Sequence, residues 1–208
     1  VIPRRGLIYD KAIPSDTDGC LTYTGLSIGM TPMSGASGSA NGGSWESDSL
    51  FASIQVGYLN GSTWTQDNKA SMVGSTTYNC FTRIPKIYQR VTKMDDYRVE
   101  LVLDTKPFKG ATLHPAFVMD GAEVNYKYIG RFLGRNVSSK LTSTSGGQPT
   151  RSLTRAEFRT LAKANGSNYG LMSYYDWDLV NKLFLFAFKN FDSQTALGKG
   201  WTGKTTYR

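Results

Sequence analysis

The sequence predicts an α+β fold in which two helices pack on one side of a mostly antiparallel sheet. Short β-prone runs occupy the first 132 residues, and a helical period replaces them from residue 153 onward. The chain of 208 residues contains 22 glycines, which favours a loop-rich β body over a helical bundle. Hydrophobic residues make up 39% and charged residues 19%, a folded composition, and the length allows one large domain or two small ones.

The first ninety residues are short apolar pieces separated by turn residues. LTYTGLSIGM alternates as one or two strands interrupted by glycines, and residues 31–47 are so rich in small residues that they predict a long surface loop. SLFASIQVGYLNGSTW predicts an extended segment that turns at Asn60-Gly61, a dipeptide suited to a tight hairpin. We therefore expect a loop-rich β region over residues 1–80.

Two strongly β-prone runs follow, CFTRIPKIYQRV and YRVELVLD, with TKMDD between them. The second run alternates as a half-buried strand, with Val99, Leu101 and Leu103 set against Arg98, Glu100 and Val102. AFVM and YKYIGRF are then joined by DGAEVN, whose Asp120-Gly121 pair is a hairpin turn signal. These pieces predict one hairpin, with Tyr126, Tyr128 and Phe132 alternating along its return strand.

Helical periodicity begins after the predicted loop SSKLTSTSGGQPTRS. SLTRAEFRTLAKANG has a capping box at Thr154-x-x-Glu157 and a stop at Asn165-Gly166. YYDWDLVNKLFLFAFKNF predicts a second helix that is apolar around most of its circumference and therefore buried. Its predicted main stripe is Trp177, Val180, Phe184, Phe188 and Phe191, with Leu179, Leu183 and Phe186 on the flank. The final stretch, QTALGKGWTGKTTYR, is small and turn-rich and predicts no further strand.

Catalytic chemistry has few candidates. A Ser-His-Asp or Cys-His arrangement would have to use His114, the single histidine, and we favour a structural role with its ring satisfied by a backbone group. GSWES does not match the nucleophile elbow G-x-S-x-G, because Trp45 stands where the serine should be. The pair Asp176-x-Asp178 opens the second helix, where acids favour the helix dipole and Asp176 can cap. No catalytic residue is predicted.

Metal and phosphate sites are not predicted either. Asp16-x-Asp18 lacks the remaining oxygen ligands of a calcium loop, and GASGSANGG lacks the lysine and helix start of a phosphate cradle. The spacing of Cys20 and Cys80 fits no metal site. We favour two free, buried thiols over a single disulfide bridge, and we expect that the protein is made in a reducing compartment. We predict no cofactor.

The charge is +8, and it lies in the second half of the chain. Residues 1–104 hold nine Lys and Arg against ten Asp and Glu, whereas residues 105–208 hold fifteen against six. An anionic partner would suit this asymmetry: nucleic acid, a negatively charged cell-wall polymer or an acidic subunit. No run of four basic residues exists, so we favour a scattered, solvated positive surface over nucleic-acid binding.

Aromatic and basic residues interleave in YKYIGRF and RIPKIYQR, as they do on some nucleic-acid-binding surfaces. Strands with one buried face explain the same alternation. No apolar run reaches membrane-spanning length and VIPRRGLIYD is not a signal peptide, so we expect a soluble protein without membrane insertion.

The order of these motifs resembles the C-type-lectin-fold tail proteins of bacteriophages and prophages, which include receptor-binding tail-tip and fibre proteins and targets of diversity-generating retroelements. The matching pieces cover most of the chain: LTYTGLSIGMTP, GSW before an F/I-rich strand, IPKIYQRV, HPAFVMDGAEVNYKYIGRF, SLTRAEFRTLAKANG, and the second helix followed by NFDSQTALGKG. The resemblance implies a C-type-lectin-like core over residues 81–208, after the loop-rich region.

The sequence departs from this fold's known members at three places. Gln148-Pro149-Thr150 is the nearest piece to the Glu-Pro-Asn or Gln-Pro-Asp of calcium-dependent sugar-binding lectins, and it lacks their acid. Formylglycine-generating oxidases share the fold but need a cysteine pair late in it, and no cysteine follows Cys80. The family usually continues past QTALGKG into the ligand-binding strands and loops, so we expect either a fragment or a shortened member with a scaffolding role.

The resemblance implies a non-enzymatic virion protein of the tail or tail tip, made in the bacterial cytoplasm, that recognises a host-surface glycan or protein. The alternative is a purely structural virion protein, such as a decoration, baseplate or fibre scaffold component. Both imply other virion proteins as partners, and we expect a homo-oligomer.

Exposed aromatic and basic side chains near the C-terminal end of the sequence are the candidate ligand-binding residues. Tyr and Trp offer large, rigid contact area and stack well on sugar rings. The candidates are Lys199, Trp201, Lys204 and Tyr207, with Tyr174 and Tyr175 at the start of the second helix. The alternative for Trp201 is packing on the core.

Overall fold

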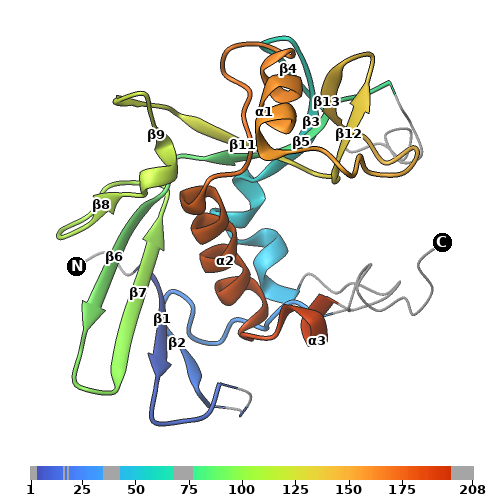
Figure 1. The fold of residues 1–208 in the computed structure, drawn as a ribbon. Coiled ribbons are helices and arrows are strands. Elements are labelled where there is room, and N and C mark those ends of the chain that lie inside the picture. Colours follow the sequence, from blue (N-terminus) through green and yellow to red (C-terminus); the bar gives the residue numbers. More distant parts are fainter. Residues whose placement is uncertain (1–3, 16, 18, 35–42, 68–76, 198–208) are drawn as a thin grey trace. The chain divides into compact units, whose positions relative to one another are not determined.

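The computed structural model describes residues 4–15, 17, 19–34, 43–67 and 77–197, and it confirms an α+β protein with antiparallel sheets and few helices (Figure 1). The strands are β1 Arg5–Asp10, β2 Leu21–Gly25, β3 Gln55–Asn60, β4 Thr63–Gln66, β5 Cys80–Pro85, β6 Tyr88–Lys93, β7 Arg98–Asp104, β8 Thr112–Leu113, β9 Val118–Met119, β10 Ala122–Glu123, β11 Tyr126–Gly130, β12 Gly134–Val137 and β13 Lys140–Ser143. The helices are α1 Arg155–Lys163, α2 Tyr174–Phe188 and α3 Ser193–Leu197, with 3-10 turns η1 Gly43–Ser47, η2 Phe51–Ser53 and η4 Pro115–Phe117.

The chain forms two compact units, each assembled from separate segments of the sequence. Unit 1 comprises Val1–Ala52, Lys86–Val118 and Asp178–Arg208, and unit 2 comprises Ser53–Pro85 and Met119–Trp177. One boundary therefore falls inside α2. The sequence-based division between residues 80 and 81 stays a prediction.

Unit 1 contains a five-stranded antiparallel sheet in the order β2-β1-β7-β6-β8 (Figure 1). Its second strand, β1, was not predicted from the sequence. Leu7 of β1 lies opposite Tyr23 of β2, and the Tyr23 hydroxyl donates to the Phe186 carbonyl of α2 over 2.5 Å. On the other face Glu100 accepts hydrogen bonds from Thr24 at 3.2 Å and from Arg90 at 3.3 Å. The alternation predicted for β7 is not observed, because burial increases along the strand and its last three residues, Val102, Leu103 and Asp104, are all buried.

Trp45 lies at the centre of the unit 1 core. It belongs to η1, a short helical turn within the stretch predicted to be a surface loop, so that prediction is wrong for residues 43–47; residues 35–42 lie outside the described part. The side chain is 0% exposed, and its ring meets Tyr23, Phe51 and Phe186 at centroid distances of 5.6, 4.8 and 6.0 Å. Burial of this one large ring places the segment in the core, although the small, polar residues around it are typical of a surface loop.

The hydroxyl of Tyr23 gives unit 1 a pH dependence at alkaline pH. Burial raises the pKa of Tyr23 from 10.0 to about 12, although the Trp45 indole N–H that the oxygen accepts opposes the shift. Because the folded pKa lies above the unfolded one, this contribution to stability is complete below pH 10 and is lost as pH rises toward 12. We expect the stability of the wild type to fall more steeply between pH 10 and 12 than that of Tyr23→Phe. Urea unfolding at a series of pH values measures both slopes, and equal slopes would contradict the expectation.

Unit 2 contains a four-stranded antiparallel sheet in the order β11-β5-β3-β4, together with the β12–β13 hairpin and α1. A tight hairpin is present where predicted, but its turn is shifted by one residue: Asn60 pairs with Thr63, so Gly61, with φ +58°, and Ser62 form the loop in place of Asn60-Gly61. The run CFTRIPKIYQRV is not one strand. It divides into β5 of this sheet and β6 of the unit 1 sheet.

The hairpin predicted from AFVM to YKYIGRF is only partly present. Asp120 and Gly121 do form its turn, with φ values of +50° and +80°, but the turn joins the two-residue strands β9 and β10. β11, expected to be the return strand, pairs instead with β5, 45 residues earlier at the Tyr128–Arg83 pair. The predicted loop after residue 137 contains β13, which pairs with β12.

The first helix is confirmed, including its capping box. The Thr154 hydroxyl accepts the Glu157 backbone N–H at 3.3 Å, and the Glu157 carboxylate accepts the Thr154 backbone N–H at 2.7 Å. The backbone N–H and the hydroxyl of Thr154 both donate to the Glu157 carboxylate, and these two hydrogen bonds lower the pKa of Glu157. Beyond the helix, the Asn165 side chain donates to the Leu141 carbonyl of β13 at 2.8 Å, which ties the predicted helix stop to the hairpin.

The second helix is confirmed, but its buried face is not the one predicted. Leu179, Leu183 and Phe186, predicted on the flank, are buried, whereas Trp177, Val180 and Phe191 of the predicted main stripe are exposed. A helix apolar on nearly all sides contains no pattern that selects between adjacent faces. α3 was also not predicted; Asp192 caps it by accepting the Gln194 and Thr195 backbone N–H groups at 2.8 and 3.1 Å.

Candidate functional site

Four of the six candidate ligand-binding residues lie outside the described residues: Lys199, Trp201, Lys204 and Tyr207. The other two, Tyr174 and Tyr175, form the first turn of α2, where they are 71% and 52% exposed. The candidate site is therefore built on the unit 2 end of this helix.

A second capping box fixes the start of α2. Ser173 and Asp176 exchange hydrogen bonds, the serine hydroxyl accepting the Asp176 backbone N–H at 3.2 Å and the carboxylate accepting the Ser173 backbone N–H at 2.8 Å. Asp176 is buried, and its other oxygen pairs with the Lys127 ammonium of β11 at 2.9 Å. Asp176 thus helps to cap the helix as predicted, while Ser173 supplies the capping hydroxyl. The pair with Lys127 attaches the first turn to the unit 2 sheet.

Three exposed side chains of this turn form an aromatic cluster, defined here as Tyr174, Tyr175 and Trp177. The Tyr174 ring lies 5.8 Å from that of Tyr175 and 6.2 Å from that of Trp177, centroid to centroid. Trp177 is 55% exposed. The sequence prediction did not include it among the site residues and assigned it to the buried stripe. The Ser173-x-x-Asp176 spacing was the available signal, because it places the following aromatic residues on a first helical turn.

His114 is part of a separate, buried arrangement in unit 1. Its Nδ1 accepts the Ala116 backbone N–H at 3.2 Å, so in the neutral ring Nε2 carries the proton and donates to Asp178, 3.1 Å away. Asp178 also pairs with the Lys182 ammonium at 2.6 Å, which donates to Gln89 at 2.8 Å.

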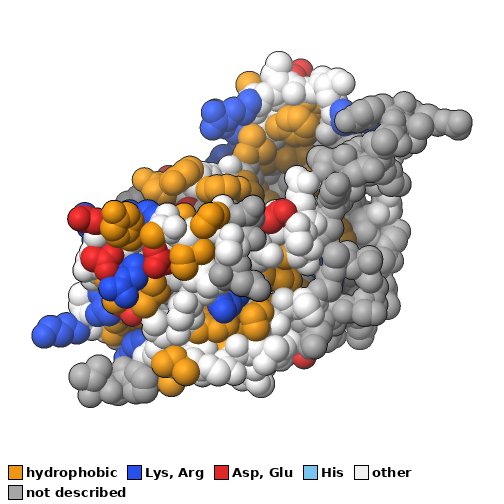
Figure 2. Space-filling model, turned by 90° about the horizontal axis from the view of Figure 1, so that it is seen from below, with side chains coloured by type: hydrophobic (Ala, Val, Ile, Leu, Met, Phe, Trp, Pro, Cys, Tyr) orange, Lys and Arg blue, Asp and Glu red, His pale blue; other side chains and the backbone are white. Residues whose placement is uncertain are grey.

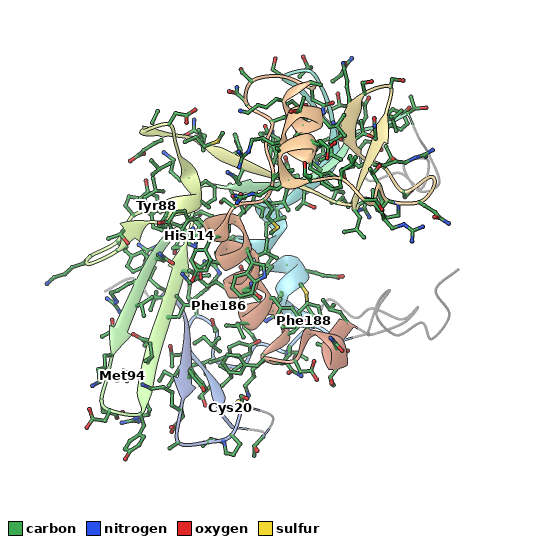
Figure 3. The ribbon with its side chains drawn as sticks, viewed as in Figure 1. Cys20, Tyr88, Met94, His114, Phe186 and Phe188 are labelled. Carbon is green, nitrogen blue, oxygen red and sulfur yellow. The ribbon has the colours of Figure 1, made fainter. Side chains whose placement is uncertain are left out.

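The imidazole of His114 is fully buried, near Tyr88 and α2 in Figure 3. It caps η4, whose start at Pro115 leaves the Ala116 N–H for the ring to accept. The predicted backbone partner of the ring is thus confirmed. The ring has a second partner that the sequence did not reveal, the side-chain carboxylate of Asp178. This geometry positions the helix against the sheet and offers no exposed nitrogen to a substrate.

The remaining inventory gives no stronger site. Cys20 and Cys80 are unbridged and buried, and burial raises the pKa of the Cys80 thiol, which disfavours the reactive thiolate. Within the described residues, no three His, Cys, Asp or Glu side chains are grouped as metal ligands require, and no helix is long and apolar enough to cross a membrane. Asp16 and Asp18 lie outside the described part.

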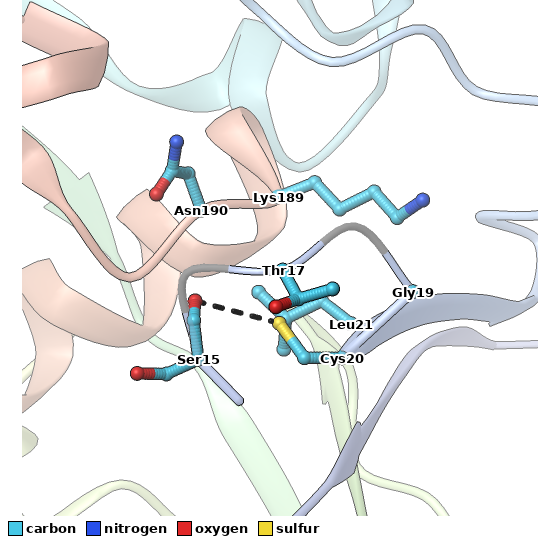
Figure 4. Close-up of a pocket in the computed structure, with 7 residues that line it drawn as sticks. All are labelled: Ser15, Thr17, Gly19, Cys20, Leu21, Lys189 and Asn190. Atoms are coloured by element: carbon cyan, nitrogen blue, oxygen red, sulfur yellow. Dashed lines mark hydrogen bonds between the residues drawn. The ribbon is translucent and has the colours of Figure 1, made fainter. Parts of the chain in front are cut away.

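One shallow pocket of about 80 Å³ lies in unit 1 beside Cys20, Lys189 and Asn190 (Figure 4). The Cys20 thiol points to the Ser15 carbonyl, 3.6 Å away. Pockets that enclose small organic ligands usually measure about 300–1,000 Å³. This one is too small for such a ligand, so the aromatic cluster is the stronger candidate.

No protein-family model, no curated protein and no solved structure matches this chain. The geometry of its own residues therefore carries the functional argument.

Proposed function

We propose that this chain is a bacteriophage virion protein with a C-type-lectin-like fold, located in the tail or tail tip, that attaches to a glycan on the host surface. The observation that carries the proposal is the exposed aromatic cluster at the start of α2. The order of motifs that resembles phage tail proteins supports the virion assignment.

The aromatic cluster has the chemistry of a sugar-binding surface. Tyr and Trp rings present large apolar faces with a polar group at one edge, which suits the mixed character of a sugar ring. The cluster is also held in place, because the capping box and the Lys127–Asp176 pair fix the turn that carries it. A fixed surface loses little conformational entropy when it binds.

A binding assay with the whole chain tests the proposal. Immobilised bacterial polysaccharides, both lipopolysaccharide and cell-wall polymers, serve as probes for wild type, Tyr174→Ala and Tyr175→Ala. We expect wild type to bind at least one polymer saturably and each variant to bind it at least tenfold more weakly, since removing an aromatic anchor of a binding surface costs about 2 kcal/mol or more and about 1.4 kcal/mol is a factor of ten.

Tyr97→Ala is the matched control, because Tyr97 is also an exposed tyrosine but lies in unit 1, before β7. It should leave the affinity unchanged. Equal losses for Tyr97→Ala and Tyr174→Ala, or no saturable binding to any polymer, would overturn the proposal.

The second candidate is a structural virion protein whose exposed apolar side chains contact neighbouring subunits. The β6–β7 hairpin of unit 1 favours it, since Val91, Met94 and Tyr97 are exposed there, and Figure 3 shows Met94 at the hairpin end. The face in Figure 2 likewise shows hydrophobic side chains among charged ones, a mixture found in non-obligate protein interfaces. Two results together would select this candidate. The wild type would assemble into particles while Met94→Lys would not, and the wild type would bind no polysaccharide.

A further inference from the structure

One face of the unit 2 sheet gathers aromatic and polar side chains around an arginine. In the register of the sheet, Arg83 of β5 lies between Gln55 of β3 and Tyr128 of β11. Directly paired residues of antiparallel strands project to the same face, and diagonal neighbours are within reach of long side chains. Tyr126 is such a neighbour, because it pairs with Pro85 two residues further along.

These side chains lie together in a group defined here as the Arg83 stack: Tyr126, Arg83, Trp64 and Tyr128. The guanidinium carbon of Arg83 lies 4.4 Å from the Tyr126 ring centroid and 5.1 Å from that of Trp64, and the Trp64 and Tyr128 centroids are 5.4 Å apart with the rings tilted by 54°. The guanidinium thus contacts the faces of two aromatic rings, an arrangement that arginine adopts readily.

The fold makes specific room for the tryptophan of this stack. A Cβ on Gly57 would come within 2.8 Å of the Trp64 ring and 2.1 Å of the Thr65 carbonyl oxygen. Only glycine allows the ring to lie this close to the strand. The position of Trp64 is therefore built into the sheet.

The stack has hydrogen-bond donors without acceptors. Among the described residues, Arg83 has no acidic partner, and its only hydrogen bond is from Nη2 to the Gln55 side-chain oxygen. In the described part of the chain its Nε is buried without a partner, and so is the indole Nε1 of Trp64. Buried polar groups almost always have partners, so two unpartnered donors on neighbouring side chains make the stack a candidate site for an external acceptor.

The charge of unit 2 favours an anion as that acceptor. Its segments hold ten Lys and Arg against five Asp and Glu. Two of the five acids, Glu157 and Asp176, are occupied by their capping boxes. The stack therefore lies in a unit of net positive charge, and no carboxylate of the described residues pairs with Arg83.

We propose that the Arg83 stack binds the anionic group, carboxylate or phosphate, of an acidic surface saccharide. The guanidinium pairs with the anion, and the Tyr126 ring, 43% exposed, offers its open side to the sugar. The inference rests on the proposed attachment function and adds a second subsite. Lys127 alternates with Tyr126 and Tyr128 along β11 and pairs with Asp176, so the aromatic cluster is fixed from the opposite face of the sheet.

Isothermal titration of the whole chain with three small probes tests this inference. The probes are trigalacturonate, its neutral methyl ester and glucose 6-phosphate. We expect one of the two anions to bind at least tenfold more tightly than the methyl ester, and which one does so identifies the anionic group. Arg83→Met should remove this preference, and Arg151→Met, which removes the same charge from an exposed arginine of unit 2, should leave it intact.

Two further measurements keep the test decisive if Arg83→Met fails to fold. In the wild type, the preferred anion should shift the ¹⁵N–¹H resonance of the Trp64 indole, and Tyr126→Ala should weaken its binding about tenfold. Equal affinity for all three probes, or equal losses in Arg83→Met and Arg151→Met, overturns the inference. A third result separates the two claims. If Tyr174→Ala abolishes polysaccharide binding and Arg83→Met leaves it unchanged, the inference is overturned and the proposed function stands. If the small anion binds at Arg83 but no polysaccharide binds, the proposed function is overturned and the anion site stands.

Discussion

Replacing Trp45 with alanine should lower the free energy of unfolding by about 3–5 kcal/mol, the usual cost of removing a large buried aromatic side chain. The ring is fully buried among Tyr23, Phe51 and Phe186, and its indole N–H donates to the Tyr23 hydroxyl at 3.2 Å. The substitution leaves a cavity at the contact between sheet and α2, and it removes one partner of a half-buried hydroxyl. Urea unfolding followed by far-UV circular dichroism measures the loss.

Trp177→Ala provides the control, because it removes the same side chain from a position that is 55% exposed. Substitutions at such surface positions usually change stability by about 0.5 kcal/mol or less. A loss at Trp177 equal to that at Trp45 would contradict the assignment of the two residues to core and surface. The pair also separates stability from binding, since Trp177 belongs to the aromatic cluster.

Local signals predicted their elements correctly. The capping box at Thr154 and Glu157 and the Asp120-Gly121 turn involve residues within three or four positions of one another, so the sequence contains their whole geometry. The two-residue turn at Ser138-Ser139 was missed because its residues do not carry the usual local signal. Both serines have positive φ, a conformation that Asn and Gly normally indicate.

Pairing between distant strands could not be predicted in this way. Alternation in YKYIGRF indicates a strand with two different faces, but it does not select β5 as the partner. The same limit explains the candidate sites. Tyr174 and Tyr175 were predicted from composition, whereas the Arg83 stack depends on the register of four strands. The interleaved aromatic and basic residues were visible in the sequence, but only the sheet brings Trp64 to them.

Replacing Arg5 with methionine should cost about 3–5 kcal/mol of unfolding free energy, since it leaves the largely buried Asp48 carboxylate without its counter-ion, whereas Asp104 keeps Arg4 at 2.7 Å. The Arg5 side chain is 7% exposed, and its Nε lies 2.7 Å from both carboxylate oxygens of Asp48. Its Nη2 donates to the Ser49 hydroxyl at 2.7 Å, and its Nη1 is 3.8 Å from Asp104. Arg5 thereby ties β1 to the segment that carries Trp45 and to the end of β7. Chemical unfolding at pH 7 measures the effect.

Arg98→Met is the control, because it breaks an ion pair with Asp95 whose side chains are 50% and 39% exposed. Solvent screens an exposed pair of this kind, and ordering its two side chains costs entropy, so the stability of this variant should remain close to that of the wild type. The double variant Arg5→Met/Asp48→Asn gives a second test of the mechanism. It has no unpaired carboxylate at position 48, so it should be more stable than Arg5→Met alone. Equal stability of the two variants would show that lost packing of the long side chain, rather than unpaired charge, causes the destabilisation.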